Sequence, residues 1–117
     1  MMLRFRDVLS AKDREHVHQI FSGDPAEDTP PVQARSKVNQ FLWNDTYIAE
    51  EAVQAFKEMT QAERERLISE LIWRVTCHLD GSITRVPGLR AYPLGKRFSA
   101  HPTEQDNRTI LCLGVAG

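Results

Sequence analysis

Two thiols and two imidazoles are the side chains in this 117-residue chain that are best suited to chemistry. They belong to Cys77, His78, His101 and Cys112, and four such groups would satisfy a structural zinc site in number. Zinc ligands usually come in pairs separated by two to four residues, whereas Cys77 and His78 are adjacent and point apart on a helix. The spacing therefore argues against a metal site, and we expect neither a metal nor another cofactor.

A cysteine nucleophile with a histidine base is a second interpretation of the same residues, with Asp80 or Asp106 as the group that orients the base. A reactive thiol needs a positive environment, such as a helix N-terminus. Cys77 lies near the predicted C-terminus of a helix and Cys112 lies in an apolar run, and both positions disfavour the thiolate. A thiol-dependent enzyme that uses Cys77 or Cys112 is therefore the second alternative, and catalysis is not the expectation.

Basic and aromatic residues are interleaved in the C-terminal third, in a composition that suits phosphates or stacked bases. Residues 1–81 carry 10 lysines and arginines against 14 acidic residues, whereas residues 82–117 carry 5 against 2. A nucleic-acid module is usually strongly basic, and the net charge here is −1, so an anion or nucleic-acid binder is the first alternative. Its candidate residues are Arg85, Arg90, Lys96, Arg97 and Arg108, interleaved with Tyr92, Phe98 and His101.

Three aromatic residues are candidates for anchoring a protein partner. Trp43 and Tyr47 flank the helix-breaking pair Asn44-Asp45, and Trp73 lies away from the main apolar stripe of its predicted helix. Tryptophan and tyrosine are common interface anchors because they bury a large area at a small cost in side-chain freedom. The same residues also occur at the rim of a core, so both interpretations stay open.

The length and composition of the chain predict one soluble domain over residues 1–117. A chain of this size can bury roughly two-thirds of its unfolded surface in a single core. Its 41% hydrophobic and 26% charged residues are close to the globular average, which argues against disorder and against a fibrous repeat. Arginines interrupt the N-terminal segment too early for a secretory signal, and no apolar run approaches the ~20 residues of a membrane span. We therefore expect a cytoplasmic protein without a membrane partner.

The first predicted helix begins with the segment Ser10–Asp13, in which a hydroxyl cap is followed three residues later by a carboxylate. His16 and His18 lie two positions apart on this helix, so they diverge and are not expected to form a site by themselves. The polar, proline-rich stretch at residues 22–31 ends the helix and is predicted to be a flexible loop.

Two more helices are predicted between Val32 and Met59, because apolar residues recur there on one helical face. The first is expected to stop at Asn44-Asp45. The second is expected to include Ile48, with Asp45 or Thr46 as its N-cap.

The fourth helix has the strongest start, where Thr60 and Glu63 form a capping box. Its hydroxyl and carboxylate can satisfy two backbone N–H groups that would otherwise lack partners. A broad apolar stripe then runs to Val75, and we expect this helix to be central to the core.

The pattern changes after Gly81, where short alternating or apolar runs replace helical periodicity. Residues 82–86 and 110–113 are predicted strands, separated by prolines and glycines that exclude another long helix. The predicted fold class is therefore α+β and mainly helical, with about four helices followed by a small two- or three-stranded antiparallel β element.

Five short segments stand out between Val38 and Leu94: Val38-Asn39-Gln40, Ala52 to Phe56, Ala62-Glu63-Arg64, Ser82-Ile83 and Gly88-Leu89-Arg90. Together they resemble a group of small bacterial domains of unknown function, over about half the chain. Those domains usually carry an aromatic pair where this chain has Ala55-Phe56. The resemblance implies a bacterial or phage origin and supplies no activity and no site residue.

The sequence favours a domain that binds another protein, or a second copy of itself, without catalysis. An inhibitor, an immunity-type neutraliser of a toxin or an adaptor would fit a lone domain of this size. Its acidic helical part would meet the partner, with Trp43, Tyr47 or Trp73 as the anchor.

Overall fold

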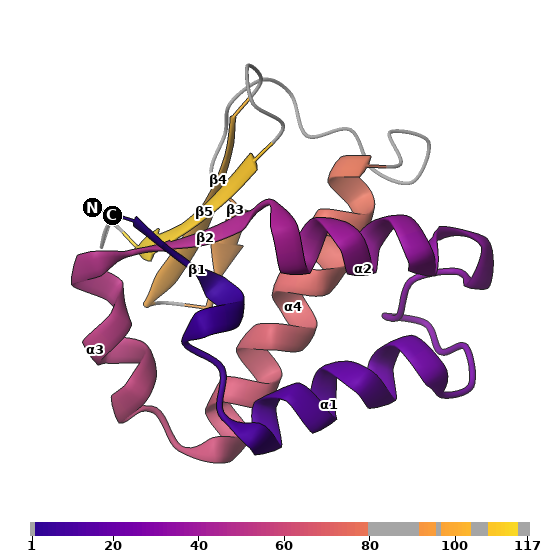
Figure 1. Cartoon of the computed structure of the whole chain (residues 1–117), viewed down its shortest axis with the longest axis horizontal. Helices are drawn as coiled ribbons and strands as arrows, with labels where there is room; N and C mark the ends of the chain where they lie inside the picture. The colour runs from indigo at the N-terminus through magenta and orange to yellow at the C-terminus, as the bar shows by residue number, and fades with distance from the viewer. Residues whose placement is uncertain (1, 80–91, 96, 104–107, 115–117) are drawn as a thin grey trace.

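A computed structural model of the chain describes residues 2–79, 92–95, 97–103 and 108–114 (Figure 1). The predicted α+β class with four α-helices is confirmed for this part of the chain. The elements in chain order are β1 (Met2–Arg4), the 3-10 helix η1 (Phe5–Asp7), α1 (Ala11–Ser22), the 3-10 helix η2 (Val32–Ala34), α2 (Arg35–Asn44), β2 (Thr46–Ala49), α3 (Glu50–Glu58), α4 (Gln61–Leu79), β3 (Tyr92–Leu94), β4 (Phe98–Thr103) and β5 (Arg108–Leu113).

The described strands form one five-stranded mixed sheet in the order β1-β2-β5-β4-β3. β2 and β5 are parallel, and the other neighbouring pairs are antiparallel. The strands after α4, β3, β4 and β5, form the expected antiparallel element, but the expected number of strands is wrong because β1 and β2 join them in one mixed sheet. Two strands come from the N-terminal half, and β1 has only three residues, too few for a periodic pattern to show.

The segment Thr46–Ala49 is a strand, and the prediction that a helix begins at Asp45 or Thr46 is wrong. α3 begins at Glu50 with Ala49 as its N-cap, and no side chain caps it. The Thr46 hydroxyl instead donates to the Phe41 carbonyl at 3.2 Å. Ile48 is fully buried in the sheet, where a β-branched residue packs well, and this tertiary contact overrides the helical spacing.

Both predicted capping boxes are present. The Asp13 backbone N–H donates to the Ser10 hydroxyl at 3.2 Å, and the Ser10 N–H donates to the Asp13 carboxylate at 3.0 Å. Thr60 and Glu63 make the same reciprocal pair at 3.2 and 3.0 Å. These capping boxes fix the starts of α1 and α4, because each box satisfies two backbone N–H groups that would otherwise lack partners at the helix N-terminus.

α4 is the central helix, as its broad apolar stripe predicts. It lies between the sheet and the helices α1 and α2 (Figure 1), and it contacts α1, α2 and β3. The side chains of Leu71, Val75 and Ile68 are completely buried or nearly so, and they pack in one hydrophobic cluster with residues of the sheet. This cluster holds the buried side of α4 in place, so the strip of the helix that carries the exposed Arg66 and Glu70 is presented to solvent in a fixed orientation.

Several predictions fall on other parts of the chain. The predicted strand at residues 82–86 lies outside the described residues, as do Asp80, Asp106, Arg85, Arg90 and Lys96. The loop at 22–31 is described, and a turn in which the Ala26 N–H donates to the Thr29 hydroxyl at 2.8 Å shapes it. Its flexibility stays a prediction. None of the helices in the described ranges is both long enough and apolar enough to cross a bilayer.

Candidate functional site

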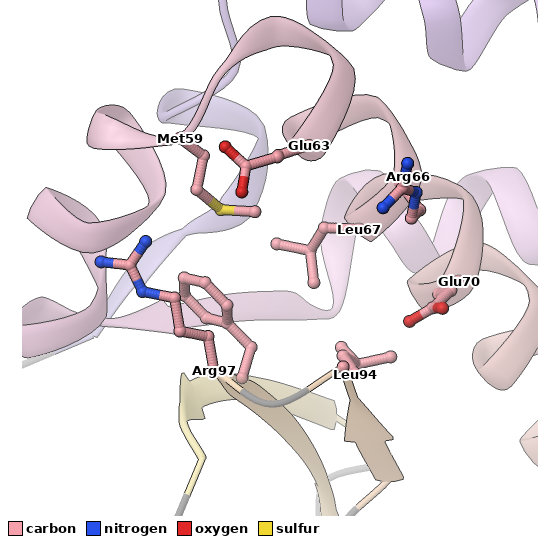
Figure 2. A pocket seen from close by; sticks show the side chains of 9 residues that line it. Met59, Glu63, Arg66, Leu67, Glu70, Leu94 and Arg97 are labelled. Carbon is pink, nitrogen blue, oxygen red and sulfur yellow. The ribbon is translucent and has the colours of Figure 1, made fainter.

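A cleft of about 260 Å³ lies between the first half of α4 and the turn that joins β3 to β4 (Figure 2). Its floor is apolar, because Leu67 from α4 meets Leu94 and Phe98 from the two strands. These three side chains are buried, and Met59 closes the cleft at the end of α3. The cleft is therefore a hollow in the surface whose base is continuous with the hydrophobic core.

The turn that carries the cleft's outer wall depends on a glycine. Gly95 has φ of 71°, a left-handed conformation that side chains rarely adopt. The Gly114 N–H donates to the Arg97 carbonyl at 2.6 Å, which extends the pairing of β4 and β5 by one position and holds Arg97 beside the sheet. This geometry brings Arg97 to the rim of the cleft, opposite the start of α4 (Figure 2).

Charges of both signs surround the apolar floor. Hydrogen bonds to Thr60, through its backbone and its side chain, lower the pKa of the Glu63 carboxyl, and the nearby Arg97 and Arg66 lower it further. Glu63 is therefore a constant anion at neutral pH. Figure 2 shows Arg97 on one side of Leu67 and the pair Arg66 and Glu70 on the other.

A second hollow, of about 360 Å³, continues along the same side of α4. It shares Arg66 and Glu70 with the cleft, so the two hollows are contiguous. We call this continuous surface the α4 outer face. It comprises the cleft residues above together with Asp28, Ser69, Trp73 and Arg74.

The α4 outer face brings together two of the residues that the sequence singles out as binding candidates, Trp73 and Arg97. Trp73 lies in the second hollow and Arg97 in the first. They are 24 positions apart in the chain, and the packing of β3 against α4 makes them part of one surface.

Trp43 and Tyr47 lie elsewhere, and each is half-buried beside an arginine. The Trp43 indole N–H donates to Asn39 Oδ1 at 2.7 Å, and the Arg14 guanidinium lies 5.6 Å from the ring centroid. The Arg108 guanidinium lies 5.2 Å from the Tyr47 ring. Both aromatic side chains thus make cation–π contacts within the chain, and Trp43 also packs against the core.

The thiols and imidazoles of the first hypothesis do not form one cluster. Cys77 is buried inside α4, and Cys112 is half-buried on β5, and neither forms a disulfide. Burial lowers the pKa of His78, which lies 6.4 Å from the Phe41 ring, whereas His101 shares a 3.1 Å hydrogen bond with Ser99 on β4. In the described ranges we find no group of three side chains positioned to hold a metal ion.

Burial and the nearby Glu51 raise the pKa of the Cys112 thiol. The protonated thiol is a weak nucleophile, so this environment is the reverse of the one that an active-site cysteine needs.

A cluster that sequence reasoning missed joins α1 to α4. His16 Nε2 lies 2.8 Å from the Ser69 hydroxyl oxygen, and His16 Nδ1 lies 3.6 Å from a carboxylate oxygen of Glu65. Glu65 and Ser69 are four residues apart on α4, so they occupy neighbouring positions on one helix face. The sequence holds no local signal for this cluster, because His16 and Ser69 are separated by 53 positions.

No known protein family, curated protein or solved structure matches this chain. The resemblance of Val38–Leu94 to small bacterial domains therefore stays a prediction.

Proposed function

We propose that the protein acts by binding another protein through the α4 outer face. The observation that carries this proposal is the contiguity of two hollows that share Arg66 and Glu70, with an apolar floor in one and Trp73 in the other. Interfaces draw most of their binding energy from a few anchors that fill such hollows, surrounded by polar residues that exclude water.

The lining of the hollows defines the chemistry of the partner. The cleft formed by Leu67, Leu94 and Phe98 would receive an apolar side chain, whose burial stabilises the complex by roughly 1.5–3 kcal/mol. The rim offers both carboxylates and guanidinium groups, so the partner's residues beside that anchor should carry charges of both signs. A partner helix with one apolar residue between charged residues fits this description.

The proposal narrows the aromatic candidates to Trp73. Trp43 and Tyr47 already contact Arg14 and Arg108, and a partner would have to disrupt those contacts to use the faces of the rings. Trp73 lines a solvent-accessible hollow beside Arg74. An inhibitor, an immunity-type protein or an adaptor would each use such a surface.

The partner can be identified by photo-crosslinking in the producing cell. A photoreactive amino acid at position 70 is expected to form a covalent adduct with one polypeptide. The same amino acid at position 51, an exposed glutamate on α3 away from α4, serves as the control. Adducts of equal yield from both positions, or an adduct with a second copy of this chain only, would count against a distinct protein partner at this face.

Anion or nucleic-acid binding through the basic segment makes a different prediction. Arg66, Arg74 and Arg97 share the α4 outer face with Asp28, Glu63 and Glu70, so the face has no excess of positive charge. Retention on heparin at low salt that is lost in Arg97→Ala would favour the anion binder. Absence of retention would favour the protein partner.

A further inference from the structure

Ser69, His16 and Glu65 place a hydroxyl, an imidazole and a carboxylate side by side. Serine hydrolases use the same three groups as nucleophile, general base and orienting acid. We propose that Ser69 is a nucleophile that accepts the acyl group of small carboxylic esters, with His16 as general base. This inference does not require a protein partner, although it uses part of the same surface. It concerns the second hollow of the α4 outer face, where Ser69 is part of the lining.

The distances fit the roles. With the imidazole proton on Nδ1, His16 Nε2 can accept the Ser69 hydroxyl proton across 2.8 Å. Glu65 lies 3.6 Å from Nδ1, beyond hydrogen-bond distance, and its carboxylate is on the side of the ring that carries the proton in this tautomer. The side chains of His16 and Glu65 are 22% and 37% exposed, so water reaches both groups and screens part of the attraction between imidazolium and carboxylate.

The second hollow supplies access and charge stabilisation. Ser69 lines it together with Trp73, Arg66 and Arg74, whereas His16 does not line it, so a substrate would meet the serine with the base behind it. Backbone N–H groups in the middle of α4 are engaged in the helix and cannot form an oxyanion hole. The guanidinium groups of Arg66 and Arg74 are the donors in this hollow that could stabilise a developing oxyanion.

The proposed reaction is the hydrolysis of an ester in two steps, and water is the only co-reactant. The Ser69 oxygen forms a bond to the ester carbonyl carbon as its proton passes to His16 Nε2. The ester C–O bond then breaks, and the leaving alkoxide or aryloxide takes that proton and departs as an alcohol or phenol. Water attacks the acyl-serine with His16 again as base, which releases the carboxylic acid and restores the Ser69 hydroxyl.

A fluorophosphonate ester tests the nucleophile directly, because it forms a stable bond to an activated serine as fluoride leaves. We expect the full-length folded protein to gain the mass of one phosphonyl group, located at Ser69 by peptide mass spectrometry. Ser69→Ala should abolish the adduct. His16→Gln should lower the labelling rate by about 100-fold, as expected for loss of a general base.

Two variants control for indirect effects. Ser36→Ala removes an exposed serine on α2, and His18→Gln removes the exposed neighbouring histidine on α1, and both should label like the parent protein. Thermal melts establish that each variant is folded before it is labelled. The proposal fails if the folded protein gains no adduct at Ser69 at millimolar reagent, or if His16→Gln labels as fast as the parent. Either result would leave the cluster as a structural tie between α1 and α4.

Discussion

The side chain of Gln61 donates a hydrogen bond to the carboxylate of Asp13 at 2.8 Å, across 48 positions of sequence. Asp13 is only 1% exposed, and its other oxygen accepts the Ser10 N–H that caps α1. Arg64 Nε lies 3.5 Å from the oxygen that Gln61 contacts. A single buried carboxylate therefore links the N-termini of α1 and α4, and it sets how the two capped helices meet.

Removal of this carboxylate should destabilise the fold. Asp13→Ala removes the carboxylate half of the α1 capping box, the hydrogen bond from Gln61 and the ion pair with Arg64. We therefore expect a loss of about 1.5–3 kcal/mol in the free energy of unfolding. Urea denaturation followed by circular dichroism measures this loss. Asp24→Ala, at an exposed aspartate in the loop after α1, is the matched control and should change stability by less than about 0.5 kcal/mol.

A side chain at Gly95 would have enough space, but the backbone conformation there disfavours any residue other than glycine. A Cβ at this position would meet nothing within 4 Å, but φ is +71°. We therefore expect Gly95→Ala to cost about 1 kcal/mol, through backbone strain alone. Gly95→Asn should cost less, because asparagine adopts left-handed conformations more readily than alanine. Equal losses for the two variants in urea denaturation would show that the strain is not the cause.

Both thiols should react slowly with an alkylating probe at pH 7. The pKa of Cys112 is raised by burial and by Glu51, and Cys77 is only 2% exposed. Intact-mass measurement over time should show slow modification of Cys112 first and modification of Cys77 mainly in denaturant. Rapid modification of either thiol in the folded protein would restore the thiol-enzyme alternative.

Glu63, the capping carboxylate of α4, should make the free energy of unfolding depend on pH. Because the pKa of Glu63 is lowered in the folded state from its ordinary value of 4.5, folding favours its ionised form. The resulting stabilisation is fully present above pH 4.5 and is lost as the pH falls through the lowered folded-state pKa. Glu63→Gln has no such titration, so its melting temperature should fall less than that of the parent between pH 6 and pH 3. Parallel losses in the two proteins would contradict this role for Glu63.

The helices could be predicted because their signals are local. The capping boxes at Ser10 and Thr60 need only four residues each, and the hydrogen bonds predicted there are present. β2 could not be separated from α3, because Ile48 is compatible with the helical spacing that follows it. The segment is a strand because Ile48 pairs with Leu111, 63 positions later, and with Leu3 on the other side.

The candidate site could be predicted only in fragments. Trp73 and Arg97 are visible in the sequence as an aromatic residue and a basic residue, but their common surface depends on the packing of β3 against α4. The cluster of His16 and Ser69 depends on the packing of α1 against α4 in the same way. Residues that come together only through the packing of helices and strands show no characteristic spacing in the sequence.

Affinity for the crosslinked partner, once it is purified, tests the central claim most directly. Isothermal titration should show that Trp73→Ala and Glu70→Arg each weaken binding by about 10-fold or more, equivalent to about 1.4 kcal/mol. Glu51→Arg, the same charge reversal at the exposed start of α3, should bind like the parent protein. Unchanged affinity in both α4 variants, with the folds intact, would contradict binding at the α4 outer face.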